Sequence, residues 1–233
     1  MSIKIGFLTI GQSPRIDVLA DLSSMLGDEF EVVEAGALDT LSRREISELA
    51  PRRGETLYVS RLRNGEMVEL SKERIIPLLN ERIAFLEGLG VKCIGLLCSG
   101  VFHKLSLKVP LIRPEPSMRG IVESVLDEGS VLGIIMPSSH QIALGKKKWS
   151  MLSCRDIIID SVSPYSGDKI SNIRRLALKF MSLNVNLVVM DCIGFSVNDM
   201  AAFKAIYNVP VVLARSALAM TIKTLYGKSI ISI

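Results

Sequence analysis

Short, continuous runs of apolar residues, separated by turn residues, constrain the fold of this chain more than any other feature. Clear examples are the runs 131–136 (VLGIIM) and 156–159 (DIII). Strands covered by helices on both faces have this pattern, whereas half-exposed strands alternate apolar and polar residues. No run approaches the ~20 residues that a membrane-spanning helix needs. The pattern therefore predicts buried parallel strands in an α/β protein without a membrane partner.

Strand and helix patterns alternate along almost the whole chain. We expect strands at 3–10, 30–35, 91–97, 109–112, 131–136, 156–162, 185–191 and 209–213. We expect helices at 14–26, 72–88, 117–128, 141–152, 168–182, 198–206 and 216–226. The first of these helices would take Ser13 as its N-cap and Pro14 as its first residue. This order of elements predicts doubly wound parallel sheets.

An internal echo suggests that the chain consists of two similar halves. The segment 91–98 (VKCIGLLC) aligns with 185–192 (VNLVVMDC), and each is followed by a Val-Pro segment and a helix pattern. The alternative explanation of the echo is that any two βαβ units look alike. We predict two pseudo-symmetric half-domains with the site in the cleft between them. The first would comprise residues 1–114 plus 215–233, and the second residues 115–214.

The segment 36–75 departs from the alternating pattern and is read as an insertion in the first half. It contains a capping-box sequence at Ser42–Glu45 and an Asn64-Gly65 pair between two β-prone runs. Asn-Gly in that position is a strong hairpin signal. The hairpin is expected at the mouth of the site or in a subunit contact, and an idle surface hairpin is the alternative.

Composition and short motifs exclude several classes of function. The net charge of +4 is dispersed and aromatic residues make up 5% of the chain, so we expect no nucleic-acid partner. The one dense basic cluster, Lys146–Trp149, is expected to be a solvated helix or loop face. The four cysteines form no Cys-x-x-Cys motif and the two histidines are isolated, so we expect no metal. No glycine-rich nucleotide motif is present, which predicts no cofactor. The N-terminus lacks signal-peptide anatomy, so we expect reduced thiols in the cytoplasm.

Small polar residues and glycines gather where the predicted strands end. In parallel α/β sheets, ligands bind beyond the carboxyl ends of the strands, where helix N-termini favour an anion. The candidate ligand-binding residues are Thr9, Gly11, Gln12, Ser13, Arg15, Ser99, Gly100, Ser138, Ser139, Ile193 and Gly194. Arg15 could pair with a substrate carboxylate, or it could be a solvated arginine of the first helical turn. A small carboxylate is the expected ligand.

Two cysteines, Cys98 and Cys192, end equivalent strands of the two halves and are the candidate catalytic residues. Facing thiols about 6–9 Å apart could remove a proton from one side of a carbon and deliver one to the other side. The alternative is that both cysteines are buried side chains with no catalytic role, which is what we expect of Cys93 and Cys154. His103 and His140 lie near strand ends and are rival bases.

These strand-end cysteines, one per half, resemble those of the aspartate/glutamate racemase superfamily, which includes hydantoin racemases, arylmalonate decarboxylases and maleate isomerases. More narrowly, the sequences 8–15 (LTIGQSPR), 191–195 (DCIGF) and 209–211 (VPV) resemble the AroM family. The resemblance spans nearly the whole chain. It implies a two-half α/β fold, cofactor-independent chemistry and a homodimer.

The sequence departs from the racemase pattern around both cysteines. Racemases follow the first cysteine with Asn or Ser and then Thr, whereas here Ser99 is followed by Gly100. They place Gly before and Thr after the second cysteine, where this chain has Asp191 and Ile193. Backbone N–H groups at Ser99, Gly100, Ile193 and Gly194 could take the place of the missing side-chain donors. The expected function is a cofactor-independent racemase, isomerase or decarboxylase, and the alternative is a non-catalytic protein that binds a small anion.

Overall fold

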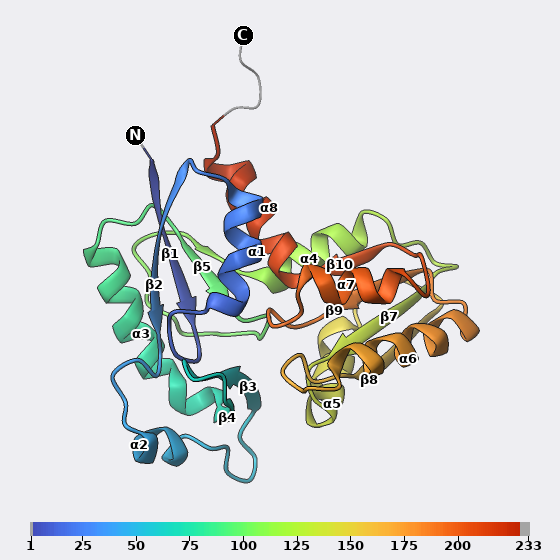
Figure 1. Ribbon diagram of the computed structural model, residues 1–233, viewed down its shortest axis with the longest axis horizontal. Coiled ribbons are helices and arrows are strands. Elements are labelled where there is room, and N and C mark those ends of the chain that lie inside the picture. Colours follow the sequence, from blue (N-terminus) through green and yellow to red (C-terminus); the bar gives the residue numbers. More distant parts are fainter. Residues whose placement is uncertain (1, 229–233) are drawn as a thin grey trace. The chain divides into compact units, whose positions relative to one another are not determined.

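The computed structural model describes residues 2–228, which divide into two compact units (Figure 1). The first unit contains the chain up to Pro114 and the segment from Leu218 onward. The second unit contains Glu115–Ala217. Within the described residues, no helix combines the length and the apolar character needed to cross a membrane.

The first unit is built on a parallel sheet with the strand order β2-β1-β5-β6. Its strands are β1 (Ile3–Thr9), β2 (Phe30–Gly36), β5 (Ile94–Leu97) and β6 (Leu111–Ile112). Leu8 in the central strand β1 lies opposite Ala35 of β2 and Leu96 of β5. All of β5 is buried, as the continuous apolar run predicts for a strand covered on both faces.

Three helices and a hairpin complete the first unit together with the end of α8. The helices are α1 (Ile16–Leu26), α2 (Arg43–Glu48) and α3 (Lys72–Gly88). The hairpin pairs β3 (Leu57–Arg61) with β4 (Met67–Ser71) in antiparallel register, confirming the expectation from Asn64-Gly65. The capping box of Ser42 and Glu45 is also present at the start of α2.

The second unit is built on a parallel sheet with the strand order β10-β9-β7-β8. Its strands are β7 (Val131–Met136), β8 (Asp156–Ser161), β9 (Leu187–Met190) and β10 (Val211–Leu213). Its helices are α4 (Pro114–Glu123), α5 (Ile142–Trp149), α6 (Lys169–Ser182) and α7 (Val197–Lys204), and α8 (Ala214–Tyr226) begins there. A short 3₁₀ turn at Ser139–Gln141 precedes α5.

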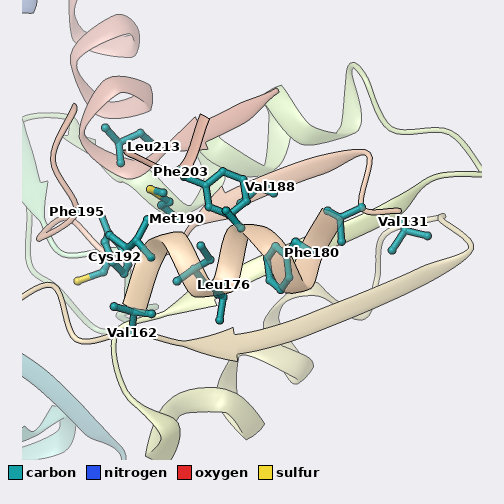
Figure 2. Close-up of a cluster of buried hydrophobic side chains, with 14 residues drawn as sticks. Val131, Val162, Leu176, Phe180, Val188, Met190, Cys192, Phe195, Phe203 and Leu213 are labelled. Carbon is teal, nitrogen blue, oxygen red and sulfur yellow. The ribbon is translucent and has the colours of Figure 1, made fainter. Parts of the chain in front are cut away.

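A cluster of buried side chains joins α6 and α7 to the sheet of the second unit (Figure 2). Phe180 and Phe203 meet edge to face with ring centroids 6.1 Å apart. Phe180 also packs against Gly133 of β7, where a Cβ atom would lie 2.6 Å from the ring. Figure 2 shows Cys192 at one end of this cluster, with its sulfur directed away from the other labelled side chains.

The predicted α/β class with parallel sheets is confirmed, and the differences concern the ends of elements. The first helix starts at Ile16 rather than Pro14, and Ser13 makes other contacts. The predicted helix 117–128 runs instead over Pro114–Glu123. The strand predicted at 91–97 starts only at Ile94.

Candidate functional site

The two strand-end cysteines lie in turns of the same local geometry. Cys98 follows β5, and the N–H of Gly100 donates to its Sγ at 3.4 Å. Cys192 follows β9, and the N–H of Gly194 donates to its Sγ, also at 3.4 Å. A hydrogen bond donated to sulfur favours the charged form of a thiol. Each unit therefore presents one thiol with a local feature that can stabilise a thiolate.

The two thiols differ in their exposure to solvent. Cys98 is half-buried, whereas only 7% of Cys192 is exposed. The remaining cysteines lie in surroundings that disfavour a thiolate. Burial raises the pKa of Cys93 to about 11, against a lowering by a hydrogen bond with Tyr226. Burial also raises the pKa of Cys154. Cys93 packs in the core as expected, but Cys154 is half-buried and lies outside it.

The turn after β1 is held together by hydroxyl and carboxylate groups. Thr9 Oγ1 accepts from the N–H of Gly11 at 3.2 Å. Asp39 accepts from the N–H of Ser13 at 2.7 Å and from its hydroxyl at 2.6 Å. The prediction that Ser13 caps the first helix is therefore wrong: Asp39, which follows β2, takes both of its donors and instead fixes the turn.

Arg15 is buried and bonded to side chains of its own unit. It is 2% exposed, and its Nε and Nη2 both donate to the carboxylate of Asp17 at 2.8 Å. Its Nη1 donates to Thr9 Oγ1 at 3.3 Å. Its backbone N–H donates to Glu34, whose pKa is raised chiefly by burial. The alternative of a solvated arginine is therefore wrong, because this network buries the guanidinium.

The hairpin of the insertion lies directly on this first turn. The N–H of Gln12 donates to the carbonyl of Arg61 at 3.2 Å, and the N–H of Arg63 donates to Gln12 Oε1 at 3.0 Å. Arg63 Nε donates to the carbonyl of Ser13 at 2.6 Å. A Cβ atom at Gly11 would lie 2.4 Å from the carbonyl oxygen of Arg61. The hairpin is therefore bonded to the turn after β1 through both backbone and side-chain groups.

A groove of about 400 Å³ runs between the first turn and the tip of the hairpin. It is lined by Pro14, Arg15, Ile16, Asp17 and residues 61–65. Arg61 and Arg63 are 33% and 55% exposed along the groove. Arg61 lies 3.7 Å from the carboxylate of Asp17 and Arg63 lies 3.6 Å from that of Asp39, so the exposed cations of the groove are already partly balanced by carboxylates.

Asp191, which precedes Cys192, has two partners within α5. Its carboxylate accepts from Lys148 Nζ at 2.7 Å and from Trp149 Nε1 at 2.8 Å. The side chain of Lys148 is 7% exposed and Trp149 is fully buried. The expectation of a solvated face over Lys146–Trp149 is therefore wrong for these two residues, because Asp191 draws both of them inward.

The turn after Cys192 is tied to the start of α8. The carbonyl of Ile193 accepts from Arg215 Nε at 3.2 Å and from Arg215 Nη2 at 2.8 Å. Arg215 is 1% exposed. Sequence reasoning passed over this arginine because nothing near residue 215 marks a partner for it. The N–H groups of Gly100 and Gly194, expected to bind a substrate carboxylate, donate to the cysteines of their own turns.

The remaining candidates lie on two loops. Ser138 Oγ accepts from the N–H of His140 at 3.3 Å and so caps the 3₁₀ turn, while Ser139 is exposed. Ser99 is buried beside Cys98. Both histidines, His103 and His140, are exposed. No group of three or more His, Cys, Asp or Glu side chains in residues 2–228 is arranged to hold a metal ion.

Comparison with solved structures identifies the class of fold. Aspartate racemase of Picrophilus torridus is similar with a TM-score of 0.60 and 16% identity, over 98% of this chain and 96% of that one. Allantoin racemase of Pseudomonas fluorescens has a TM-score of 0.59 and 10% identity, over 96% and 90%. An arylmalonate decarboxylase has a TM-score of 0.58 and 9% identity, over 97% and 93%. The chain therefore has the same fold as these racemases and this decarboxylase.

The family is narrower than the fold. The family model described as AroM protein matches residues 5–226, so this chain belongs to the AroM family. No curated protein sequence gives a significant match.

Proposed function

We propose that this protein is a cofactor-independent racemase or isomerase that acts at the α-carbon of a small carboxylate, with Cys98 and Cys192 as its acid/base pair. The observation that carries the proposal is the repeated Cys-x-Gly turn. Each turn ends a buried parallel strand, and each directs a glycine N–H to the sulfur at 3.4 Å. A thiol that only fills space in a core needs no hydrogen-bond donor, whereas both of these sulfurs have one.

The proposed chemistry uses only the two thiols and balances its protons. One thiolate removes the α-proton, and the electron pair of the broken C–H bond is left on a planar carbanion conjugated with the carboxylate. The opposite thiol then donates its proton to the other face of that carbon. The first cysteine ends as a thiol and the second as a thiolate, so the roles are exchanged for the reverse reaction.

A second candidate is a protein that binds a small anion without reacting with it. Its specific support is that three polar residues of the turn after β1 are already bonded to protein groups and are not free to hold a substrate at the thiols. Gln12 is bonded to Arg63, Ser13 to Asp39 and Arg15 to Asp17. An anion would then bind along the groove beside Arg61 and Arg63 and never reach a thiol.

Deuterium exchange separates the two candidates. The protein is incubated in D₂O with single enantiomers of amino, hydroxy and aryl carboxylic acids, and loss of the α-proton signal is followed by NMR. The proposal expects exchange with at least one acid class and its loss in a Cys98→Ala, Cys192→Ala double variant. Binding of an acid without exchange at any pH would favour the second candidate.

A reagent that bridges two thiols tests whether the sulfurs serve one substrate carbon. In a Cys154→Ser background, a short dibromoketone should join the peptides that contain Cys98 and Cys192. Single modification of each cysteine without a bridge would contradict the pair. We further propose a cytoplasmic homodimer, which sedimentation analysis of the purified chain would test.

A further inference from the structure

In each unit a tyrosine lies against the glycine of the Cys-x-Gly turn. A Cβ atom built at Gly100 would lie 2.6 Å from Tyr58 Cζ and 2.9 Å from its hydroxyl. A Cβ atom built at Gly194 would lie 2.7 Å from the Tyr165 hydroxyl and 2.8 Å from its Cζ. Neither glycine has a positive φ, so the backbone conformation does not require glycine at these positions. Glycine is required at these positions by the tyrosine rings, which occupy the space that any side chain would need.

The two tyrosines come from unrelated parts of their units. Tyr58 lies on β3, in the hairpin of the insertion, and is buried. Tyr165 lies in the loop between β8 and α6 and is half-buried. Since neither segment belongs to the internal echo, shared ancestry of the two strands does not by itself explain why both turns meet a tyrosine hydroxyl.

Tyr58 holds the turn after Cys98 through its hydroxyl. The N–H of Val101 donates to this hydroxyl at 3.0 Å, and the hydroxyl donates to the carbonyl of Val101 at 3.2 Å. The N–H and the carbonyl of Val101, which belong to the two successive peptides after Gly100, are thereby both held by this hydroxyl. The same turn directs the Gly100 N–H to Cys98 Sγ. A more rigid turn therefore keeps this hydrogen bond formed for a larger fraction of the time.

We infer that Tyr58 and Tyr165 are positioning residues, each of which holds the N–H···S contact of one cysteine and so keeps that thiol ready to ionise. The inference deepens the proposed function, because poised thiols are what the acid/base pair requires. It assigns one tyrosine to one cysteine in each unit: Tyr58 to Cys98 and Tyr165 to Cys192. Neither tyrosine needs to touch a substrate for this role.

Site-resolved alkylation tests the assignment without any substrate. Rates of iodoacetamide modification at Cys98 and Cys192 are measured by peptide mass spectrometry across a pH series in Tyr58→Leu and Tyr165→Leu. The high-pH plateau of each profile reports access of the reagent, whereas its midpoint reports the stability of the thiolate. Tyr58→Leu should move the midpoint of Cys98 upward and slow its modification near neutral pH by about three- to tenfold, the size expected for one weakened hydrogen bond. Cys192 should keep its wild-type profile, and Tyr165→Leu should give the converse.

Two results would overturn the inference. One is an unchanged midpoint at the assigned cysteine in a variant that melts as the wild type does. The other is an equal shift at both cysteines in each variant, which indicates a general loosening of the fold. If a leucine variant does not fold, Tyr58→Phe decides: it keeps the ring, loses both Val101 hydrogen bonds, and must still shift the midpoint of Cys98 alone.

Failure of the proposed function gives a different pattern. In that case no acid would exchange its α-proton in the wild type, whatever the alkylation profiles show. If exchange is present but the profiles do not follow the tyrosines, the proposed function stands and the positioning role falls.

Discussion

The carboxylate of Asp191 accepts a hydrogen bond from the indole Nε1 of Trp149 at 2.8 Å, directly before the cysteine that follows β9. Lys148 neutralises the same carboxylate. An aspartate next to a cysteine would otherwise disfavour the thiolate by like-charge repulsion. The ion pair with Lys148 therefore offsets the repulsion that this carboxylate would exert on a thiolate at Cys192.

Removing the Lys148 charge should destabilise the protein strongly. Lys148→Met removes the cation that pairs with the buried Asp191 carboxylate at 2.7 Å, and breaking a buried ion pair typically costs about 3–5 kcal/mol. Lys147→Met is the matched control, because Lys147 is exposed and a surface change of this kind stays within about 0.5 kcal/mol. Urea denaturation measures both. Adding Asp191→Asn to Lys148→Met should recover at least about 1 kcal/mol, and strictly additive losses would contradict the pairing.

A methyl group at Gly11 should separate the hairpin from the first turn. The added Cβ would lie 2.4 Å from the Arg61 carbonyl oxygen and equally close to Ser60 Oγ, so the backbone of β3 has to move. Overpacking of this kind costs about 1–3 kcal/mol. Gly120→Ala in α4 is the control: nothing lies within 4 Å of its Cβ, so it should stabilise by up to about 1 kcal/mol. Equal thermal stability of the two variants would show that the hairpin can move away from the first turn at no cost in stability.

The stability of the fold should fall at alkaline pH through Cys93. Its pKa is about 11 in the folded chain, above the ordinary thiol value of about 8.5 in the unfolded chain. Between these values the unfolded state has lost the thiol proton and the folded state has kept it. The folded state then binds more protons, so the free energy of unfolding decreases as pH rises through this window. Below it the contribution is fully present. In Cys93→Ala, urea titrations at several alkaline pH values should give a shallower decline than in the wild type.

The parallel sheets were predictable from sequence because their signal is local. Each buried strand is a short apolar run, and the Asn64-Gly65 pair predicts the hairpin. The contacts that shape the site were not predictable, because they join residues far apart in the sequence. Ser13 meets Asp39, 26 residues on, and Tyr58 meets Val101, 43 residues on. The Ser13 cap failed for this reason: a serine before a proline has a good local partner in a helix, and a remote carboxylate outcompetes it.

Alkylation near neutral pH should reach Cys98 first. It is half-buried and accepts the Gly100 N–H, whereas Cys192 is more deeply covered. Cys154 is also half-buried, but burial raises its pKa. Cys93 is buried, and its pKa is raised to about 11. Peptide mapping after a brief exposure to iodoacetamide gives the order directly. Modification of Cys154 before Cys98 would mean that exposure, and not the turn, governs reactivity.

Single cysteine variants should divide the two half-reactions if the proposed pair is correct. Cys98→Ala and Cys192→Ala should each abolish net racemisation, because one face of the carbanion loses its acid. The remaining thiolate can still remove and return a proton on its own face, so each variant should exchange the α-proton of one enantiomer for deuterium.

The two variants should prefer opposite enantiomers, which NMR on separated enantiomers in D₂O would measure. A planar carbanion is reprotonated from whichever face retains a thiol, and the two cysteines are assigned to opposite faces. Decarboxylation gives a different outcome: loss of CO₂ generates the carbanion, one thiol suffices to protonate it, and one of the two variants should stay active. Exchange of the same enantiomer by both variants would contradict the assignment of one cysteine to each face.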